Sequence, residues 1–279
     1  MATTSLEWRI AKTLLFLKIQ LEKDLGRTPT FDPRTTLNNK YSVLPDILPP
    51  AGTDTDLKYY GIGIRGARNI DQGFRRVPEE VLNTNMDLYL PLPLRVVPKD
   101  DDLPPAERLL YRIRRELDID GTIYVLYYLK VLEQVGDEVI FTIKNSQGNE
   151  VPYTIDYGNL TPTPPQAPNP GTVEDTANEI NATASVRAVI NGYEVNEAVS
   201  VLYNGDPSYG MISELGFYTG QDFTSSFTDS TGVSVPYTES IMTQLAIHYT
   251  WLGSGMNEPS YVKRFNLRFG TTDLVLTGV

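Results

Sequence analysis

The sequence predicts an α+β protein that is mainly β. We expect an N-terminal helix, extended arms and a mixed helix and strand region, followed by a C-terminal antiparallel β-sandwich. Three observations support this fold class. Apolar residues recur at helical spacing over residues 5–25. The 17 Tyr, 20 Pro and 21 Gly favour strands, turns and extended chain. Short alternating segments separated by turn residues fill residues 175–279, which is typical of a sandwich.

Residues 5–25 predict the first helix. Its apolar residues form one stripe: Leu6, Ile10, Leu14, Leu17, Leu21 and Leu25. A second apolar set, which includes Trp8, Leu15 and Ile19, lies off that stripe. Such a helix has too much apolar surface to be covered on one side only. Either it is buried in its own domain, or it docks against a neighbouring subunit through Trp8, Leu15 and Ile19.

Prolines interrupt residues 27–56 and again residues 77–98. Because proline interrupts helices and is rare in central strands, neither segment is expected to form a long helix or a central strand. Long irregular segments in a compact protein tend to be functional or to reach toward partners. We therefore expect extended arms in this part of the chain.

A second helix is predicted over residues 104–117. Its apolar face would consist of Leu109, Leu110, Ile113 and Leu117. Three arginines would line another face: Arg108, Arg112 and Arg115. Because Arg forms bidentate pairs with carboxylates, this stripe is a candidate for docking acidic surface on a neighbour. The alternative is pairing within the helix, where Glu107 and Glu116 lie nearby.

Strands are predicted for most of the remaining chain. Residues 121–133 form an apolar aromatic run, and residues 137–144 and 149–157 fit the two arms of a hairpin. Five prolines in residues 158–171 indicate a semi-rigid linker. The domains are therefore predicted as 1–157 and a β-sandwich over 175–279, with a proline-rich linker over 158–174.

The sandwich prediction begins with a hairpin at Asn191–Gly192. Asn-Gly between two apolar segments, residues 183–190 and 193–203, is a strong hairpin signal. Further strands are predicted at residues 211–220, 233–240, 241–251 and 262–270.

Composition excludes several kinds of site and partner. The chain has no Cys, so it has no disulfide, thiol nucleophile or Cys-based zinc site. A net charge of −11 argues against general binding to nucleic acid or to an anionic membrane. The N-terminus lacks the pattern of a signal peptide, and no apolar run reaches the ~20 residues of a membrane span.

Three glycines have the spacing of a dinucleotide-binding loop: Gly61, Gly63 and Gly66. Asp87 even lies at the distance of the acidic residue in that fingerprint. The fingerprint also needs a buried strand before it and a helix starting within it. No continuous apolar run precedes the glycines, and Gly73 and Pro78 interrupt any helix after them. We therefore expect no cofactor, but an extended segment that something approaches closely, with Arg65 and Arg68 free to reach a neighbour.

No catalytic or metal site is predicted. Asp100, Asp101 and Asp102 lack the alternating carboxylates of a calcium loop and fit a solvated turn that caps the second helix. The single histidine, His248, falls on the polar face of its predicted strand. It is interpreted as a surface or interface histidine, with a general base as the alternative.

The segment MISELGFYTG, residues 211–220, resembles a run common in structural proteins of tailed bacteriophages, S/T-E-[IL]-G-[LF]-Y followed by a turn. Residues 28–52 are similar to virion proteins that thread extended arms across neighbours. The resemblance implies a non-enzymatic structural or assembly protein of the virion, in the tail, baseplate or neck. It also implies other virion proteins as partners in a homo- or hetero-oligomer, synthesis in the host cytoplasm, and no nucleic acid, membrane or small-molecule substrate.

The alternative is a carbohydrate- or receptor-binding β-sandwich module. Tyr-rich strands and the loop YNGDPSYG, residues 203–210, favour it. Tyr203 and Tyr209 would then mark the site.

Overall fold

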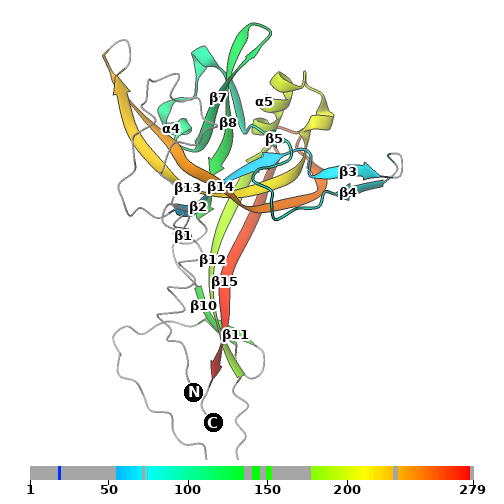
Figure 1. Ribbon diagram of the computed structural model, residues 1–279, viewed down its shortest axis with the longest axis vertical. Helices are drawn as coiled ribbons and strands as arrows, with labels where there is room; N and C mark the ends of the chain where they lie inside the picture. Colours follow the sequence, from blue (N-terminus) through cyan, green and yellow to red (C-terminus); the bar gives the residue numbers. More distant parts are fainter. Residues whose placement is uncertain are drawn as a thin grey trace, which may run out of the picture. The chain divides into compact units, whose positions relative to one another are not determined.

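A computed structural model shows a chain that is mainly β, with antiparallel sheets (Figure 1). It describes residues 18–19, 55–70, 73, 75–134, 140–144, 149–152, 177–228 and 232–276. The chain divides into two compact units. One combines residues 1–17, 134–187 and 266–279, and the other combines residues 18–133 and 188–265.

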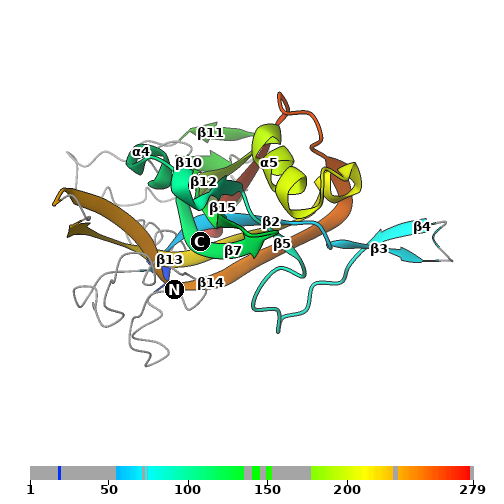
Figure 2. The ribbon, with the colours of Figure 1, turned by 90° about the horizontal axis from the view of Figure 1, so that it is seen from above.

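An eight-stranded antiparallel sheet forms the frame of the second unit. Its order is β14-β13-β2-β8-β6, with β1 and β5 also paired to β2 and β7 paired to β8. The strands are β1 (Lys18–Ile19), β2 (Thr55–Gly63), β5 (Pro91–Leu92), β6 (Arg95–Pro98), β7 (Tyr111–Ile119), β8 (Thr122–Val131), β13 (Met211–Thr228) and β14 (Ser234–Gly255). Figures 1 and 2 show β13 running between β2 and β14.

The strand β13, which contains the MISELGFYTG segment, is paired on both edges. Leu215 lies opposite Ile62 of β2 and opposite Tyr249 of β14. The strands predicted at residues 211–220 and 241–251 are thus confirmed. The predicted linker over 158–174 lies outside the described residues, and strands from both sides of it share this sheet.

The helix α5 (Gly192–Leu202) replaces the hairpin predicted at Asn191–Gly192, so that prediction is wrong. The Asn191 amide donates to the Glu194 carboxylate at 3.0 Å, the reach-back contact of a capping box. Val195, Ala198 and Val199 are buried and recur at helical spacing. The Asn-x-x-Glu signal and this periodicity outweigh the Asn-Gly turn.

The helix predicted over residues 104–117 is also wrong beyond its first turn. Only α4 (Pro105–Arg108) is helical, and β7 begins at Tyr111 and pairs with β8. Leu109 and Leu110, expected on a buried helix face, are 51% and 49% exposed, whereas Tyr111 is buried. Pairing with β8 overrides the helical spacing of the leucines, because burial against neighbouring strands decides strand formation.

Other predictions of strands are confirmed in a second sheet, ordered β11-β10-β12-β15 with β9 paired to β12. Its strands are β9 (Glu133–Gln134), β10 (Ile140–Lys144), β11 (Glu150–Pro152), β12 (Ala177–Asn191) and β15 (Val262–Leu276). The predicted hairpin is present, with Ile143 opposite Val151. β15 matches the strand predicted at residues 262–270. In the eight-stranded sheet, β8 matches the strand predicted at residues 121–133.

Shorter elements complete the described chain. The ribbon of β3 (Ala67–Ile70) and β4 (Arg75–Pro78) stands as a two-stranded sheet, and η2 (Lys99–Asp101) and η3 (Pro207–Gly210) are 3-10 helices. Of the helix predicted over residues 5–25, only Lys18–Ile19 is described, and there the chain is a strand paired with β2. Trp8, Leu15 and the rest of that segment lie outside the described residues.

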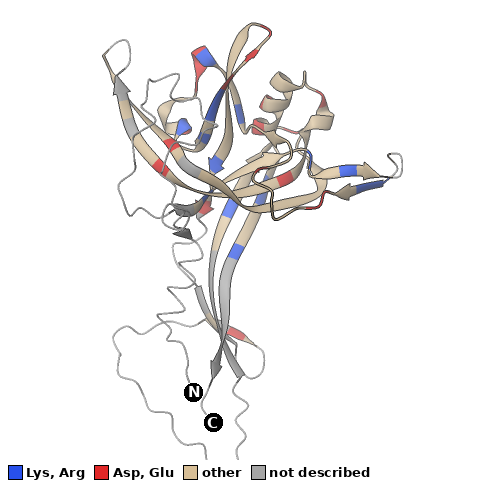
Figure 3. Ribbon diagram, in the orientation of Figure 1, with Lys and Arg blue, Asp and Glu red and all other residues tan. Residues whose placement is uncertain are grey.

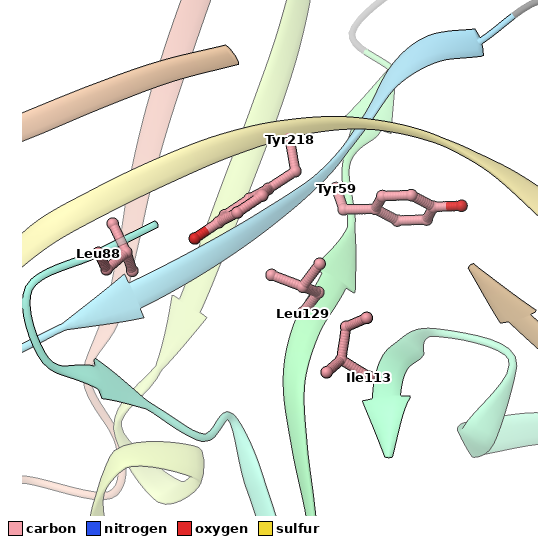
Figure 4. Close-up of a cluster of buried hydrophobic side chains, with 5 residues drawn as sticks. All are labelled: Tyr59, Leu88, Ile113, Leu129 and Tyr218. Carbon is pink, nitrogen blue, oxygen red and sulfur yellow. The ribbon is translucent and has the colours of Figure 1, made fainter. Parts of the chain in front are cut away.

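A cluster of five buried side chains forms part of the core: Tyr59, Leu88, Ile113, Leu129 and Tyr218. Figure 4 shows them together, with the hydroxyls of Tyr59 and Tyr218 pointing in opposite directions. The Tyr59 hydroxyl donates to Asp222 at 2.7 Å, and the Tyr218 hydroxyl donates to Asp87 at 2.6 Å. Both tyrosines therefore bury their rings while each phenol keeps a hydrogen-bond partner, as buried tyrosines usually do.

Candidate functional site

Glu214, in the middle of the MISELGFYTG segment, is a buried carboxylate with several hydrogen-bond partners. Its side chain is completely buried. Its oxygens accept hydrogen bonds from the backbone amides of Arg65 at 2.8 Å, Tyr89 at 2.7 Å and Leu90 at 3.2 Å. Burial opposes ionisation of Glu214, but the hydrogen bonds from His248 and from these amides outweigh it and lower its pKa.

Ser213, the neighbour of Glu214, completes the same attachment. Its hydroxyl accepts from the Gly66 amide at 2.9 Å. Together the two side chains bind four backbone amides of residues 65–90, which connect β2 with β5. We call Ser213, Glu214 and these amides the Ser-Glu staple. It fixes both ends of this stretch onto β13 through side chains instead of strand pairing. It also satisfies buried donors that would otherwise destabilise the fold.

The three glycines that imitate a dinucleotide loop lie where neighbours approach them closely. A Cβ on Gly66 would lie 2.0 Å from the Ser213 carbonyl oxygen, and a Cβ on Gly63 would lie 2.8 Å from the Leu90 carbonyl oxygen. Gly61 and Gly63 belong to the strand β2, and no helix begins at Gly63. The prediction of an extended segment with close neighbours is therefore confirmed. Gly63 and Gly66 make room for the Ser-Glu staple, whereas Gly61 makes room for Leu129 and Tyr218.

We expect Gly66→Ala to lower the free energy of unfolding by about 1–3 kcal/mol, because the added methyl group meets backbone that must shift. Urea denaturation followed by circular dichroism measures the change. The matched control is Gly73→Ala, because no atom lies within 4 Å of a Cβ at Gly73. That control carries only the cost of a positive φ of 97°. Equal stability of Gly66→Ala and wild type would contradict the close approach.

The side chain of His248 is buried within the chain, so the prediction of a surface or interface histidine is wrong. Its side chain is 2% exposed, and Nε2 lies 3.2 Å from Oε2 of Glu214. Nδ1 lies 3.3 Å from Nδ2 of Asn85, and the Tyr89 ring packs against it with centroids 5.3 Å apart. The loop over residues 79–90 folds back onto β14 and covers the imidazole. His248 contacts Glu214 on one side and Asn85 and Tyr89 of the loop on the other, so it helps to hold this loop.

A second carboxylate, Asp222 of β13, is partly buried, with a side chain that is 23% exposed, and it binds the arginine that the sequence assigned to an exposed stripe. The Arg112 side chain is 3% exposed, and its Nε lies 2.7 Å from Asp222 Oδ1. Lys58 and Tyr59 contact the same carboxylate. Burial would raise the pKa of Asp222, but Arg112, Tyr59 and Lys58 together lower it.

The predicted arginine stripe does not exist, because Arg108 ends the helix α4, whereas Arg112 and Arg115 lie on the strand β7. Arg108 is buried and donates to the Pro236 carbonyl at 2.9 Å. Arg112 is buried against Asp222, so neither residue lies on exposed surface. Arg115 is exposed and packs over the Tyr128 ring at 5.8 Å. Of the three arginines, only Arg115 is still a candidate for the predicted interface.

Arg114, which the sequence reasoning passed over, has the most buried charged side chain of this strand at 0% exposure. Its guanidinium lies 3.1 Å from Asp102 and 2.8 Å from Glu116. Asp102 also accepts from the Tyr127 hydroxyl at 2.8 Å. The interpretation of Asp102 as part of a solvated cap is therefore wrong: its carboxylate holds Arg114, and Pro104 precedes α4 without a side-chain cap.

Two further predicted interface residues, Arg65 and Arg68, lie on the surface. Arg65 is exposed, while its amide belongs to the Ser-Glu staple. Arg68 is also exposed and pairs with Glu79 at 3.4 Å, so it is accessible but has a partner in its own chain. Figure 3 shows basic residues along the β3–β4 ribbon, which carries Arg68, Arg75 and Arg76. A short two-stranded ribbon with basic residues suits contact with an acidic neighbour.

Exposed apolar side chains accompany the loop that covers His248. They are Val81, Leu82, Met86, Tyr89 and Tyr249. Met86 is 81% exposed. The Thr250 hydroxyl donates to the Glu79 carbonyl at 2.7 Å, which fixes the start of this loop on β14. An apolar surface of this kind is more often found at a site of association than on freely solvated surface.

Within the described residues, no group of His, Asp and Glu is arranged to hold a metal ion. None of the helices in the described ranges is long and apolar enough to cross a membrane. The family model described as "Family of unknown function (DUF7208)" matches residues 1–278. The chain belongs to this family. No curated protein and no solved structure matches the DUF7208 chain.

Sequence reasoning missed three carboxylates of this DUF7208 protein. Glu214, Asp222 and Glu239 lie on β13 and β14, and none of them was predicted as a site residue. One signal was available for Glu214. It stands inside an apolar segment, where an ionised group needs partners. The partners themselves are distant in sequence and could not be read from it.

Proposed function

We propose that this protein is a non-enzymatic structural or assembly protein of a tailed phage particle. It docks neighbouring subunits through extended arms and sheet faces, in the tail, baseplate or neck. The proposal also includes two structural details predicted from the sequence. They are the helix over residues 5–25 and the packing of residues 175–279 as a β-sandwich. Its partners are other virion proteins, in a homo- or hetero-oligomer.

The Ser-Glu staple is the observation that carries the proposal. The resemblance to phage structural proteins rests on the S-E-L-G-F-Y run, and in this chain both polar residues of that run bind backbone amides. The motif therefore has an architectural task. A carboxylate engaged by three amides and a histidine is not poised for proton transfer, since its ionised form is already stabilised.

Exposed groups supply surfaces for docking. The loop over residues 79–90 presents Leu82 and Met86, which are 52% and 81% exposed. The β3–β4 ribbon presents arginines, and β14 is the last strand in the order of its sheet. Such an edge offers unpaired backbone groups to another chain. The protein is acidic overall but presents an apolar and a basic surface. These surfaces favour a neighbour that has an apolar patch and an acidic patch.

Mass photometry of the full chain, alone and after co-expression with the tail, baseplate and neck gene products of the same genome, tests the proposal. We expect a defined oligomer or a stable complex. The double variant Leu82→Ser with Met86→Ser should weaken the complex, whereas Leu117→Ser, at an exposed apolar residue elsewhere, should not. A monomer that binds none of these products, and whose behaviour is unchanged by deletion of residues 27–56, would overturn the assembly function.

A further inference from the structure

A small pocket lies beside the buried cluster of Figure 4. Its volume is about 50 Å³. Leu88, Ile113, Leu129 and Tyr218 of the cluster line it. Asp87, Arg115 and Tyr128 add polar groups to this wall. A ligand site typically has an apolar wall and a small number of polar groups that converge on it.

The backbone around this pocket departs from a regular sheet. Ile113 has a φ of 57°, in the left-handed region, which a β-branched residue rarely adopts. The pairing of β7 with β8 passes from Arg112 and Leu129 to Arg114 and Tyr127 and leaves out Ile113 and Tyr128. Both omitted residues line the pocket. Strain of this kind costs about 1–3 kcal/mol and concentrates at functional sites.

A buried carboxylate holds this strained conformation. Glu239 of β14 is 2% exposed and accepts from the Ile113 amide at 3.0 Å and the Arg114 amide at 3.4 Å. The Ile113 amide is therefore satisfied without the partner strand. The opening in the β7–β8 ladder is thus built by a specific side chain, and it lies at the wall of the pocket.

The charges at the pocket are of opposite sign. Asp87 accepts from the Tyr218 hydroxyl at 2.6 Å and from the Leu88 amide at 2.9 Å, which orients its carboxylate. Arg115 is exposed and lies over the Tyr128 ring. Because a carboxylate and a guanidinium line the same pocket, the pocket favours neither a cationic nor an anionic ligand. They supply acceptors and donors to a neutral ligand whose groups both donate and accept.

We propose that this pocket binds one unit of a neutral saccharide. Sugar hydroxyls donate to the Asp87 carboxylate and accept from Arg115, while apolar faces of the ring pack against tyrosine. The small volume admits one edge of a sugar ring, because pockets that enclose a whole drug-sized ligand have about 300–1,000 Å³. This inference does not depend on the assembly function.

Tyr203 and Tyr209, which the sequence marked as a possible binding site, form an aromatic pair that is not part of the pocket wall. Tyr203 stacks on Tyr209 with centroids 4.0 Å apart and planes within 5°. Tyr209 is 38% exposed. In this proposal the pocket lined by Asp87 and Arg115 is the centre of the saccharide site, in place of Tyr203 and Tyr209.

Saturation-transfer NMR of the full chain with methyl α-D-glucopyranoside, methyl α-D-mannopyranoside, methyl β-D-galactopyranoside and N-acetylglucosamine tests the proposal. We expect at least one to bind, with a dissociation constant of about 1 mM, because a small pocket contacts few atoms. Asp87→Asn and Arg115→Ala should each weaken that binding about tenfold. Arg264→Ala and Asp100→Asn, at exposed residues elsewhere, should leave it unchanged.

Three outcomes would overturn the saccharide site. The first is that none of the four probes binds the wild-type chain. The second is that binding survives both Asp87→Asn and Arg115→Ala. The third is that glucosamine or sialic acid, tested as charged probes, binds more tightly than every neutral probe. Thermal denaturation of each variant shows that a loss of binding is not a loss of folding, and Arg115→Ala is the safer variant because Arg115 is exposed.

Discussion

Replacing Glu214 with alanine is expected to lower the free energy of unfolding by about 3–5 kcal/mol. The carboxylate accepts from the amides of Arg65, Tyr89 and Leu90, and these donors lose their partner when it is removed. Each buried donor left unpaired costs about 1–3 kcal/mol, and water that enters the vacated space offsets part of the sum. Urea denaturation monitored by circular dichroism measures the change.

Two controls separate the Ser-Glu staple from a general loss of charge. Ser213→Ala removes one acceptor, that of the Gly66 amide, and should cost about 1–2 kcal/mol. Glu80→Ala, at an exposed residue of the same loop, should change stability by less than about 0.5 kcal/mol. If Glu214→Ala cost no more than Glu80→Ala, the role of Glu214 as the main support of this loop would be wrong.

The same carboxylate should make stability depend on pH. The folded pKa of Glu214 is lowered, so its contribution is fully present above the unfolded pKa of about 4.3 and is lost as pH falls through the folded value. The free energy of unfolding should therefore fall less steeply below about pH 4.3 in Glu214→Ala than in wild type. Urea titrations of both proteins at pH 7 and across the acid range measure the difference.

Local sequence patterns predicted the parts of the fold that depend on neighbouring residues. The β10–β11 hairpin, β8 and the extended glycine segment follow from alternation, turn residues and the lack of a helix after Gly66. The segment of α5 also carried its own signal, Asn191 with Glu194 and a helical apolar spacing. The prediction failed there because the Asn-Gly pair was given more weight.

Long-range pairing decided the parts that local patterns missed. The leucines of residues 109–117 recur at helical spacing, yet β8 offers a partner strand, and burial of Tyr111 and Arg112 follows from that pairing. The site was missed for the same reason. Glu214 and Arg65 are separated by 149 residues, and Glu239 and Ile113 by 126. A single sequence shows that a carboxylate lies in an apolar strand, but not which amides it will meet.

Replacing Arg114 with methionine is expected to lower the free energy of unfolding by about 3–5 kcal/mol, because one partner of a buried ion pair is removed and the other stays. Arg114 is fully buried, and its guanidinium contacts Asp102 and Glu116. Lys99 lies 2.8 Å from Glu116 and is kept in the variant, so we expect the main cost to arise at Asp102, whose side chain is 8% exposed. Equilibrium urea denaturation measures the effect.

Arg115→Met is the matched control, because the next residue of the same strand carries the same side chain on exposed surface. It should change stability by less than about 0.5 kcal/mol. The double variant Arg114→Met with Asp102→Asn should recover part of the loss, since the stranded carboxylate is replaced by a neutral amide that still accepts from Tyr127. If the two single arginine variants were equally stable, or if the double variant were less stable than the sum of its parts, the cost would not arise from a buried unpaired carboxylate, and Arg114 would act through packing alone.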